Sequence, residues 1–170
     1  AKAAPDPEDI ETNEQLYLNG VHIEQYRHAT YEPEPYYSKA LERDEQDIRN
    51  NNAYGMLLYR QGRFDEAEKH LKKAIDRLTM RNPNPYSARI YYNLGLSLKM
   101  QDRLDEARGA FYKSVWDGKW QKCGYFALAQ IASLKGQFEQ AVHLADESLR
   151  NDPWNTRARN LKTAVLRRDR

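Results

Sequence analysis

QGRFDEA, residues 61–67, is one of three versions of the same phrase in a chain of 170 residues. The phrase returns as QDRLDEA at residues 101–107 and as KGQFEQA at residues 135–141. The first two copies are 40 positions apart and the last two are 34 apart. A repeat of this size indicates stacked structural units rather than one globular core.

The residues around each copy have helical periodicity. After Phe64, apolar side chains recur at Ala67, Leu71 and Ala74, which places them on one face of a helix. A second helix-forming segment precedes each copy of the phrase, at residues 48–60, 88–100 and 122–134. No alternating run of Val and Ile predicts a strand. The repeated unit is therefore a helix, a tight turn and a second helix.

The turns between the paired helices carry residues suited to a left-handed backbone conformation. Gly62 and Gly136 occupy this position in the first and third copies, and glycine adopts that conformation without steric cost. Asp102 occupies it in the second copy and tolerates it better than most other residues. We expect all three turns to have the same backbone geometry.

This helix–turn–helix unit resembles the tetratricopeptide repeat, whose period is 34 residues. The family has characteristic small positions, a position for leucine or an aromatic residue, and often a proline near the end of the unit. These positions are filled in three copies by Gly55, Ala67, Leu71 and Ala74, by Leu94, Gly95, Ala107, Phe111 and Ser114, and by Leu128, Ala129, Ala141, Ala145, Ser148 and Pro153. The resemblance implies an all-α fold, a right-handed superhelical α-solenoid of about nine helices in antiparallel pairs.

The resemblance also implies a domain organisation. Residues 1–12 are expected to form a linker or cut end and residues 13–168 the repeat domain. The expected repeats cover residues 14–47, 48–87, 88–121 and 122–153, with a capping helix at 154–168. The first repeat is degenerate: its first helix is expected at about 13–28, and Pro33 and Pro35 predict that its second helix begins near them.

Six extra residues account for the longer step, and they fall between Ala74 and Ala88. Leu78 and Met80 continue the apolar stripe, so the helix is expected to run about a turn longer before NPNP, residues 82–85, ends it. We interpret the insertion as tolerated, with a second docking ridge as the alternative. Trp116 and Trp120 are expected to pack at a junction between repeats, and Trp154 to begin the last helix against the preceding repeat.

The composition predicts no chemistry. The four histidines form no HExxH motif and no cluster with cysteine, and no glycine-rich nucleotide-binding loop is present. Cys123 is the single cysteine, which excludes an internal disulfide and favours a reducing, cytoplasmic setting. No apolar run is long enough to span a membrane. We predict no enzyme, no catalytic residue, no cofactor, no metal site and no membrane partner.

Charge is distributed unevenly along the chain. Residues 1–50 hold 12 acids and 5 bases, whereas residues 51–170 hold 13 acids and 22 bases. Bases are scattered among acids, which is typical of solvated helix faces, and a polyanion-binding surface remains the alternative. The acidic first third argues against a nucleic-acid partner.

In the family that the sequence resembles, the first helix of each repeat lines a concave groove that grips a partner. Carried over to this sequence, the implied contact residues are Tyr26, Arg49, Asn52, Tyr59, Arg89, Tyr92, Asn93 and Lys99. Arginine, asparagine and tyrosine suit carboxylates and extended backbones. The prediction is therefore a noncatalytic scaffold that binds a protein or peptide, with an acidic or C-terminal segment as the favoured partner.

Alternatives remain open at this point. A polar surface that binds nothing would have a similar composition. The sequence also resembles the repeat region of larger bacterial multidomain proteins of unknown function that are associated with sugar utilisation. A regulatory or assembly module of a carbohydrate-active protein is thus the second hypothesis, and self-association through an exposed end of the array is the third.

Overall fold

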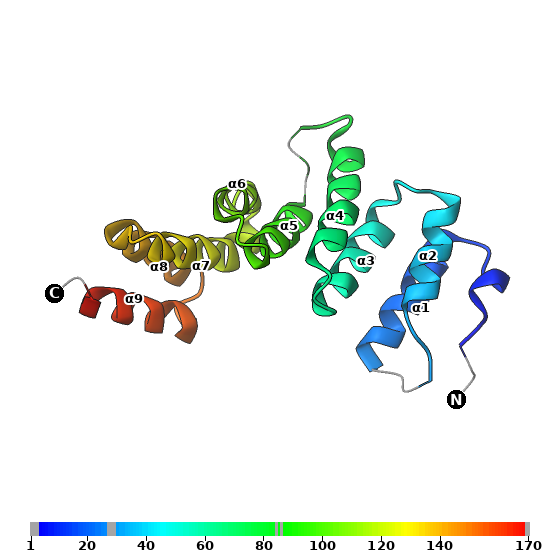
Figure 1. Cartoon of the computed structure of the whole chain (residues 1–170), viewed down its shortest axis with the longest axis horizontal. Helices are drawn as coiled ribbons and strands as arrows, with labels where there is room; N and C mark the ends of the chain where they lie inside the picture. The colour runs from blue at the N-terminus through cyan, green and yellow to red at the C-terminus, as the bar shows by residue number, and fades with distance from the viewer. Residues whose placement is uncertain (1–3, 27–29, 84, 86, 169–170) are drawn as a thin grey trace. The chain divides into compact units, whose positions relative to one another are not determined.

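A computed structural model describes residues 4–26, 30–83, 85 and 87–168 of the chain. In these residues the chain forms nine α-helices and one short 3-10 helix, η1 (Pro7–Asp9), with no strand (Figure 1). The chain divides into two compact units, unit 1 (Ala1–Asn84) and unit 2 (Pro85–Arg170). In both units the regular structure of the described residues is helical, as the periodicity predicts.

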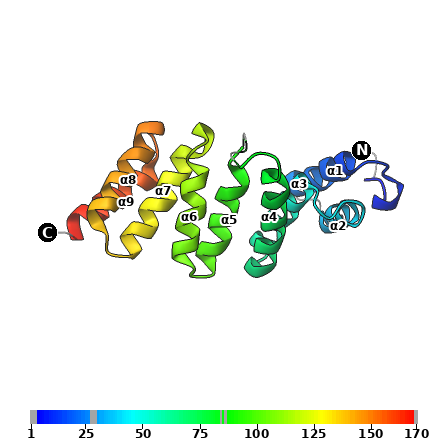
Figure 2. The same ribbon diagram turned by 90° about the horizontal axis from the view of Figure 1, so that it is seen from above.

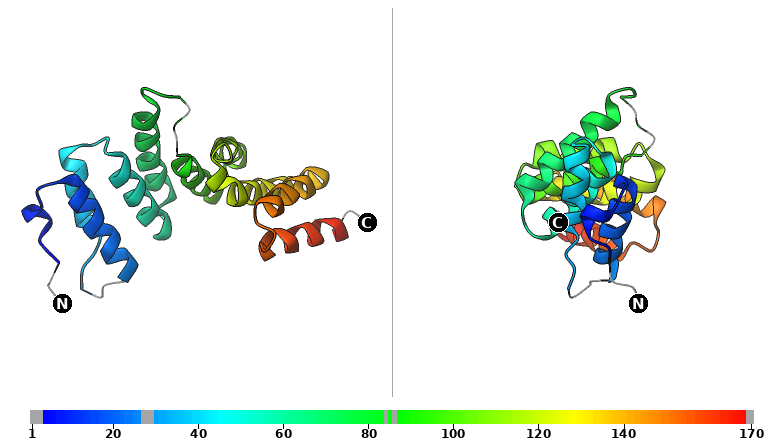
Figure 3. Two further views of the ribbon diagram at one scale, coloured as in Figure 1. Left: turned by 180° about the vertical axis from the view of Figure 1, so that it is seen from behind. Right: turned by 90° about the vertical axis from the view of Figure 1, so that its right-hand side faces the viewer.

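Unit 1 contains two helical hairpins. The first pairs α1 (Asn13–Tyr26) with α2 (Glu34–Arg43), and the second pairs α3 (Ile48–Arg60) with α4 (Phe64–Thr79) (Figure 3). Helix α2 begins directly after Pro33 and carries Pro35 in its first turn, as predicted. The prediction that the first helix extends to residue 28 falls partly on residues outside the described part of the chain.

Unit 2 consists of five helices. These are α5 (Arg89–Met100), α6 (Leu104–Ser114), α7 (Gly118–Leu134), α8 (Phe138–Asn151) and α9 (Thr156–Arg168). Figure 2 shows α5 to α8 side by side in chain order, and α9 packs against α7 and α8. Helix α7 begins at Gly118, before Lys122, because the Asp117 side chain accepts a hydrogen bond from the Lys119 backbone N–H and caps the helix there.

The three tight turns inside the hairpins have the same backbone geometry. Gly62, Asp102 and Gly136 have φ angles of 80°, 59° and 72°. After each of them, the next backbone N–H returns to a carbonyl five residues earlier, at 3.0 Å, 3.1 Å and 2.9 Å. This bond satisfies a carbonyl left open at the helix end. The repeated phrase therefore marks the end of one helix and the start of the next, as predicted.

Small residues set the distance between paired helices. Ala67, Ala107 and Ala141 are at most 1% exposed. A Cβ atom built on Gly95 would lie 2.6 Å from the Phe111 ring, and one on Gly55 would lie 3.0 Å from Leu71. Since these contacts leave no room for a larger side chain, they explain the small residues that recur at these positions.

The longer step between repeats lengthens a helix. Helix α4 has 16 residues, whereas its counterparts α6 and α8 have 11 and 14. Relative to α6 the predicted extra turn is present, but relative to α8 the helix is only about half a turn longer. The helix ends at Thr79, and Met80 is 60% exposed instead of continuing the buried stripe.

Two of the three tryptophans differ from expectation. Trp120 packs on Tyr92, with ring centroids 5.1 Å apart. Trp116, however, is 70% exposed, and Trp154 is 84% exposed because it lies in the turn before α9 rather than in the helix. The expectation that Trp116 and Trp154 are packing residues is therefore wrong. Their large rings are open to solvent.

Candidate functional site

The predicted groove residues divide between the two units, four in each. In unit 1, the Arg49 guanidinium lies 2.6 Å from the Glu14 carboxylate. Arg60, at the other end of α3, pairs with Glu24. Helix α1 carries these two acids and no base, and α3 carries these two bases and no acid. The charges of the two first helices in unit 1 therefore neutralise each other.

The remaining predicted residues of unit 1 differ in exposure. Tyr26 is 70% exposed, and its ring centroid is 4.5 Å from that of His22 on the same helix. Asn52 is buried. Tyr59 is half-buried and packs on Phe64 of α4, with ring centroids 5.5 Å apart. Of these three side chains, Tyr26 presents the most free surface.

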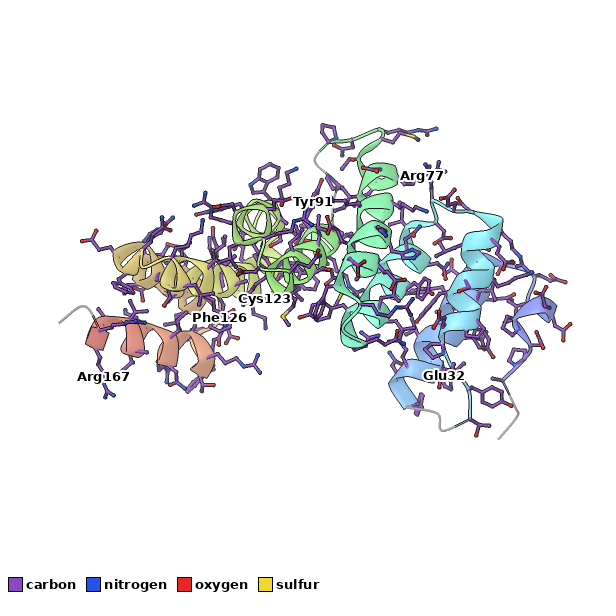
Figure 4. All side chains as sticks on the ribbon, viewed as in Figure 1. Glu32, Arg77, Tyr91, Cys123, Phe126 and Arg167 are labelled. Atoms are coloured by element: carbon purple, nitrogen blue, oxygen red, sulfur yellow. The ribbon has the colours of Figure 1, made fainter. Side chains whose placement is uncertain are left out.

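Unit 1 has a cavity of about 490 Å³ that contains none of its four predicted residues. The cavity lies at the C-terminal ends of α1 and α3, and Glu32, labelled in Figure 4, is on its wall. Its lining residues are Ile23, Glu24, Gln25, Tyr31, Glu32, Pro33, Leu57 and Arg60. Glu24 and Arg60 are already paired, and Glu24 also accepts a 2.6 Å hydrogen bond from the Tyr37 hydroxyl.

In unit 2, the predicted cations have no carboxylate partner among the residues that the structure describes. Arg89 is exposed and forms no ion pair with any described residue. Lys99 is half-buried, and its Nζ donates a 2.7 Å hydrogen bond to Oε1 of Gln130 on α7. Burial lowers the pKa of Lys99 below its ordinary value. An ammonium that is partly desolvated and bonded to a neutral amide is costly for the fold and typical of functional sites.

The other two predicted residues of unit 2 are held by packing. Asn93 is buried. The Tyr92 ring packs against Phe111 and Trp120, with centroid distances of 5.5 Å and 5.1 Å. These two contacts hold the Tyr92 ring in place.

A cavity of about 440 Å³ opens between α5, α7 and the start of α9, and we call it the α9 cavity. Its lining residues are Tyr92, Leu96, Lys122, Cys123, Phe126, Ala127, Gln130, Asp152, Trp154, Asn155, Thr156 and Arg157. Figure 4 shows Cys123 and Phe126 on the side of α7 that faces α9. The first helices of this unit thus supply the back of the cavity, and the turn before α9 supplies its rim.

Of the contact residues predicted from the sequence, Tyr92 lines this cavity. The predicted set does not include Trp154 and Arg157, because both belong to the terminal segment, which the sequence predicts to be a capping helix. A signal was available: α5, α7 and α9 contain no acidic residue, while α6 and α8 contain several. The bases on these three helices are Arg89, Lys99, Lys119, Lys122, Arg157, Arg159, Lys162, Arg167 and Arg168.

The titratable groups point to packing rather than chemistry. Burial raises the pKa of the Cys123 thiol, whose Sγ donates to the Trp120 carbonyl at 3.4 Å, so the reactive thiolate is disfavoured. His70 is held by Asn51, with Nδ1 and Oδ1 2.9 Å apart. The described residues contain no group of three His, Cys, Asp or Glu side chains that could hold a metal. His28, one of the four histidines, lies outside the described residues.

In the described part of the chain, the helices are all too short or too polar to cross a membrane.

Comparisons with known proteins agree with the fold. A family model described as Tetratricopeptide repeat matches residues 47–115, the segment that spans α3 to α6. The structure is similar to that of PilF from Pseudomonas aeruginosa, with a TM-score of 0.79 and 23% identity over 94% of this chain and 69% of that one. It is also similar to the MamA protein, with a TM-score of 0.73 and 19% identity over 91% and 87% of the two chains.

A third similar structure is the APC/C hetero-tetramer Cut9–Hcn1, with a TM-score of 0.77 and 20% identity over 91% of this chain and 30% of the matched one. At these identities the likeness shows the fold alone. The chain therefore has the all-α solenoid architecture of tetratricopeptide repeat proteins, a fold consistent with protein–protein interaction.

Proposed function

We propose that this chain is a noncatalytic scaffold that captures a segment of another protein on the first helices of its repeats. The observation that carries the proposal is the α9 cavity, because it is open, large enough for side chains, and lined by aromatic, basic and amide groups. A preformed surface of this kind binds an extended or helical segment without chemistry. A reducing, cytoplasmic setting, expected from the single cysteine, belongs to the same proposal.

An acidic or C-terminal segment is the partner that the charges favour. Within the described part of the chain, Arg89 and Lys99 have no carboxylate partner, whereas Arg49 of the predicted set is already paired with Glu14. The four predicted residues of unit 2 are therefore better placed to attract a carboxylate than the four of unit 1. Tyr26 remains a contact candidate in unit 1 because its ring is exposed.

A photo-crosslinking amino acid placed at a single position tests the proposal. At Phe126, which lines the α9 cavity, it should capture a protein partner in cells. At Gln140, an exposed position on α8 outside the cavity, the same amino acid serves as the matched control.

Capture at Phe126 with none at Gln140 is the expected result. Equal capture at both positions, or none at Phe126, would refute a partner-binding role for this cavity. Crosslinks to a second copy of the chain would favour self-association. Binding to a glycan array without a protein crosslink would favour the carbohydrate-associated alternative.

A further inference from the structure

We infer, building on the proposed function, that the α9 cavity selects an acidic peptide segment that also carries one aromatic or large aliphatic side chain. In this arrangement Arg157 and the Lys99–Gln130 pair attract the carboxylates, and Trp154 covers the apolar side chain.

The charges around the cavity favour an anionic ligand. Arg157 lines the cavity and forms no ion pair or side-chain hydrogen bond with any described residue. Lys122, on the opposite wall, has a distant partner in Asp152 at 3.8 Å. The three helices that form the cavity contain no acid, and the lining holds two bases, Lys122 and Arg157, against one acid, Asp152, so its net charge is positive.

Lys99 contributes a further positive charge near the cavity, although it does not line the cavity itself. Lys99 donates to Gln130, and Gln130 lines the cavity. The Nε2 amide of Gln130 donates to no described residue, so it remains available to a ligand oxygen. The ammonium therefore strengthens a donor at the back of the cavity, where a carboxylate would supply the negative charge that Lys99 lacks.

The exposed ring of Trp154 indicates that the ligand carries an apolar side chain. Its side chain is 84% exposed although it lines the cavity, so a ligand that covers the ring removes a large apolar surface from water. Phe126 and Leu96 line the same space. A segment made only of acidic residues would leave this apolar surface unused.

Nucleic acid fits the same groups less well. Base stacking needs free ring faces, but Tyr92 already packs against two other rings, whereas Trp154 is the more open platform. The Asp152 carboxylate also lies in the cavity beside Lys122 and would repel a continuous phosphate backbone. A peptide can place its charged and apolar groups separately, so we favour a peptide.

The test begins with selection of phage-displayed random peptides on the wild-type chain. Selected peptides are synthesised with a fluorescent label, and their Kd values are measured by anisotropy. Two pairs of variants separate the cavity from the general surface: Trp154→Ala against Trp116→Ala, and Arg157→Gln against Arg167→Gln. Trp116 is also exposed but does not line the cavity, and Arg167 lies at the far end of α9 (Figure 4).

Enriched peptides should combine acidic residues with an aromatic or large aliphatic one. Trp154→Ala should weaken their binding at least tenfold, which is about 1.4 kcal/mol. Arg157→Gln should weaken it about threefold to tenfold and reduce its salt dependence. Trp116→Ala and Arg167→Gln should bind like the wild type. Neutral versions of the peptides, with amides in place of side-chain carboxylates or of the terminal one, should bind more weakly.

Enrichment of neutral or basic peptides, or equal binding by the two tryptophan variants, would overturn the inference while leaving peptide binding intact. Trp154-dependent binding of a single-stranded oligouridine, with no peptide enriched, would overturn it in favour of nucleic acid. If no peptide is enriched and Phe126 captures no protein, the proposed function fails as well.

Cys123 provides a separate measure of where the peptide lies, because it is the single cysteine and lines the cavity. A bound peptide should slow the alkylation of Cys123 by iodoacetamide. The rate is measured by mass spectrometry of the intact protein. An unchanged rate at saturating peptide would place the ligand elsewhere and overturn the inference.

Discussion

The contact between Gly95 and Phe111 gives the sharpest test of how the repeat packs. A Cβ atom on Gly95 would lie 2.6 Å, 2.7 Å and 2.9 Å from three carbons of the Phe111 ring. The ring cannot move aside easily, since Phe111 is fully buried and also packs on Tyr92. Gly95→Ala should therefore push α5 and α6 apart or strain the ring.

The expected free-energy change has two parts. Overpacking a tight core site costs about 1–3 kcal/mol. The substitution also stabilises the helix by about 0.5–1 kcal/mol, because alanine is a better helix former than glycine. The net loss of unfolding free energy should be about 1 kcal/mol, within a range of about 0–2.5 kcal/mol, measured by urea denaturation. For a cooperative unit of the size of unit 2 (Pro85–Arg170), each kcal/mol of lost stability corresponds to a fall of about 4–8 °C in Tm.

Gly109 on α6 provides the matched control. It is exposed, and a Cβ atom there would meet nothing within 4 Å. Gly109→Ala should therefore stabilise the protein by about 0.5–1 kcal/mol. Opposite signs for the two substitutions support the packing described here. A Gly95→Ala protein as stable as the Gly109→Ala protein would refute it.

Two further substitutions test charged and titratable groups. Burial lowers the pKa of His70 below its unfolded value of about 6.5, so the unfolded chain binds more protons and stability falls as pH decreases through that value. His70→Gln should therefore reduce the pH dependence of the unfolding free energy between about pH 5 and 7, measured by urea denaturation at several pH values. An unchanged slope of unfolding free energy against pH would contradict this prediction. Lys99→Met removes a half-buried ammonium that has no carboxylate partner among the described residues. The variant should therefore be at least as stable as the wild type at neutral pH, while it binds acidic peptides less tightly. A large loss of stability would show that Lys99 has a structural role.

Most of the fold could be predicted because its determinants are local. Helical periodicity, turn residues and recurring small residues are each visible within one repeat, and each has a direct structural counterpart, such as the positive φ of Gly62, Asp102 and Gly136. Helix ends depend on less regular signals. The Asp117 cap moves the start of α7 to Gly118, and the segment after Pro153 becomes a turn before α9 begins at Thr156.

The candidate site could be predicted only in part, because side-chain pairing is not written in the repeat pattern. Arg49 and Lys99 occupy similar predicted roles on first helices. Their environments differ because Glu14 faces Arg49, whereas Lys99 meets the neutral Gln130. These partners are 35 and 31 residues away in the sequence, so a pattern confined to one repeat could not identify them.

The difference between those two pairs suggests how the two units divide their roles. An ion pair between exposed side chains contributes little stability, but it cancels the field that would attract a ligand. In unit 1 the charges of both arginines of α3 are neutralised in this way by the two glutamates of α1. In unit 2 Lys99 is half-buried and has no carboxylate partner among the described residues, so its partly desolvated charge is costly for the fold. Such a cost is expected where an anionic partner supplies the missing charge, so we propose that unit 2 carries the binding role, with the exposed Arg157 adding to its positive field.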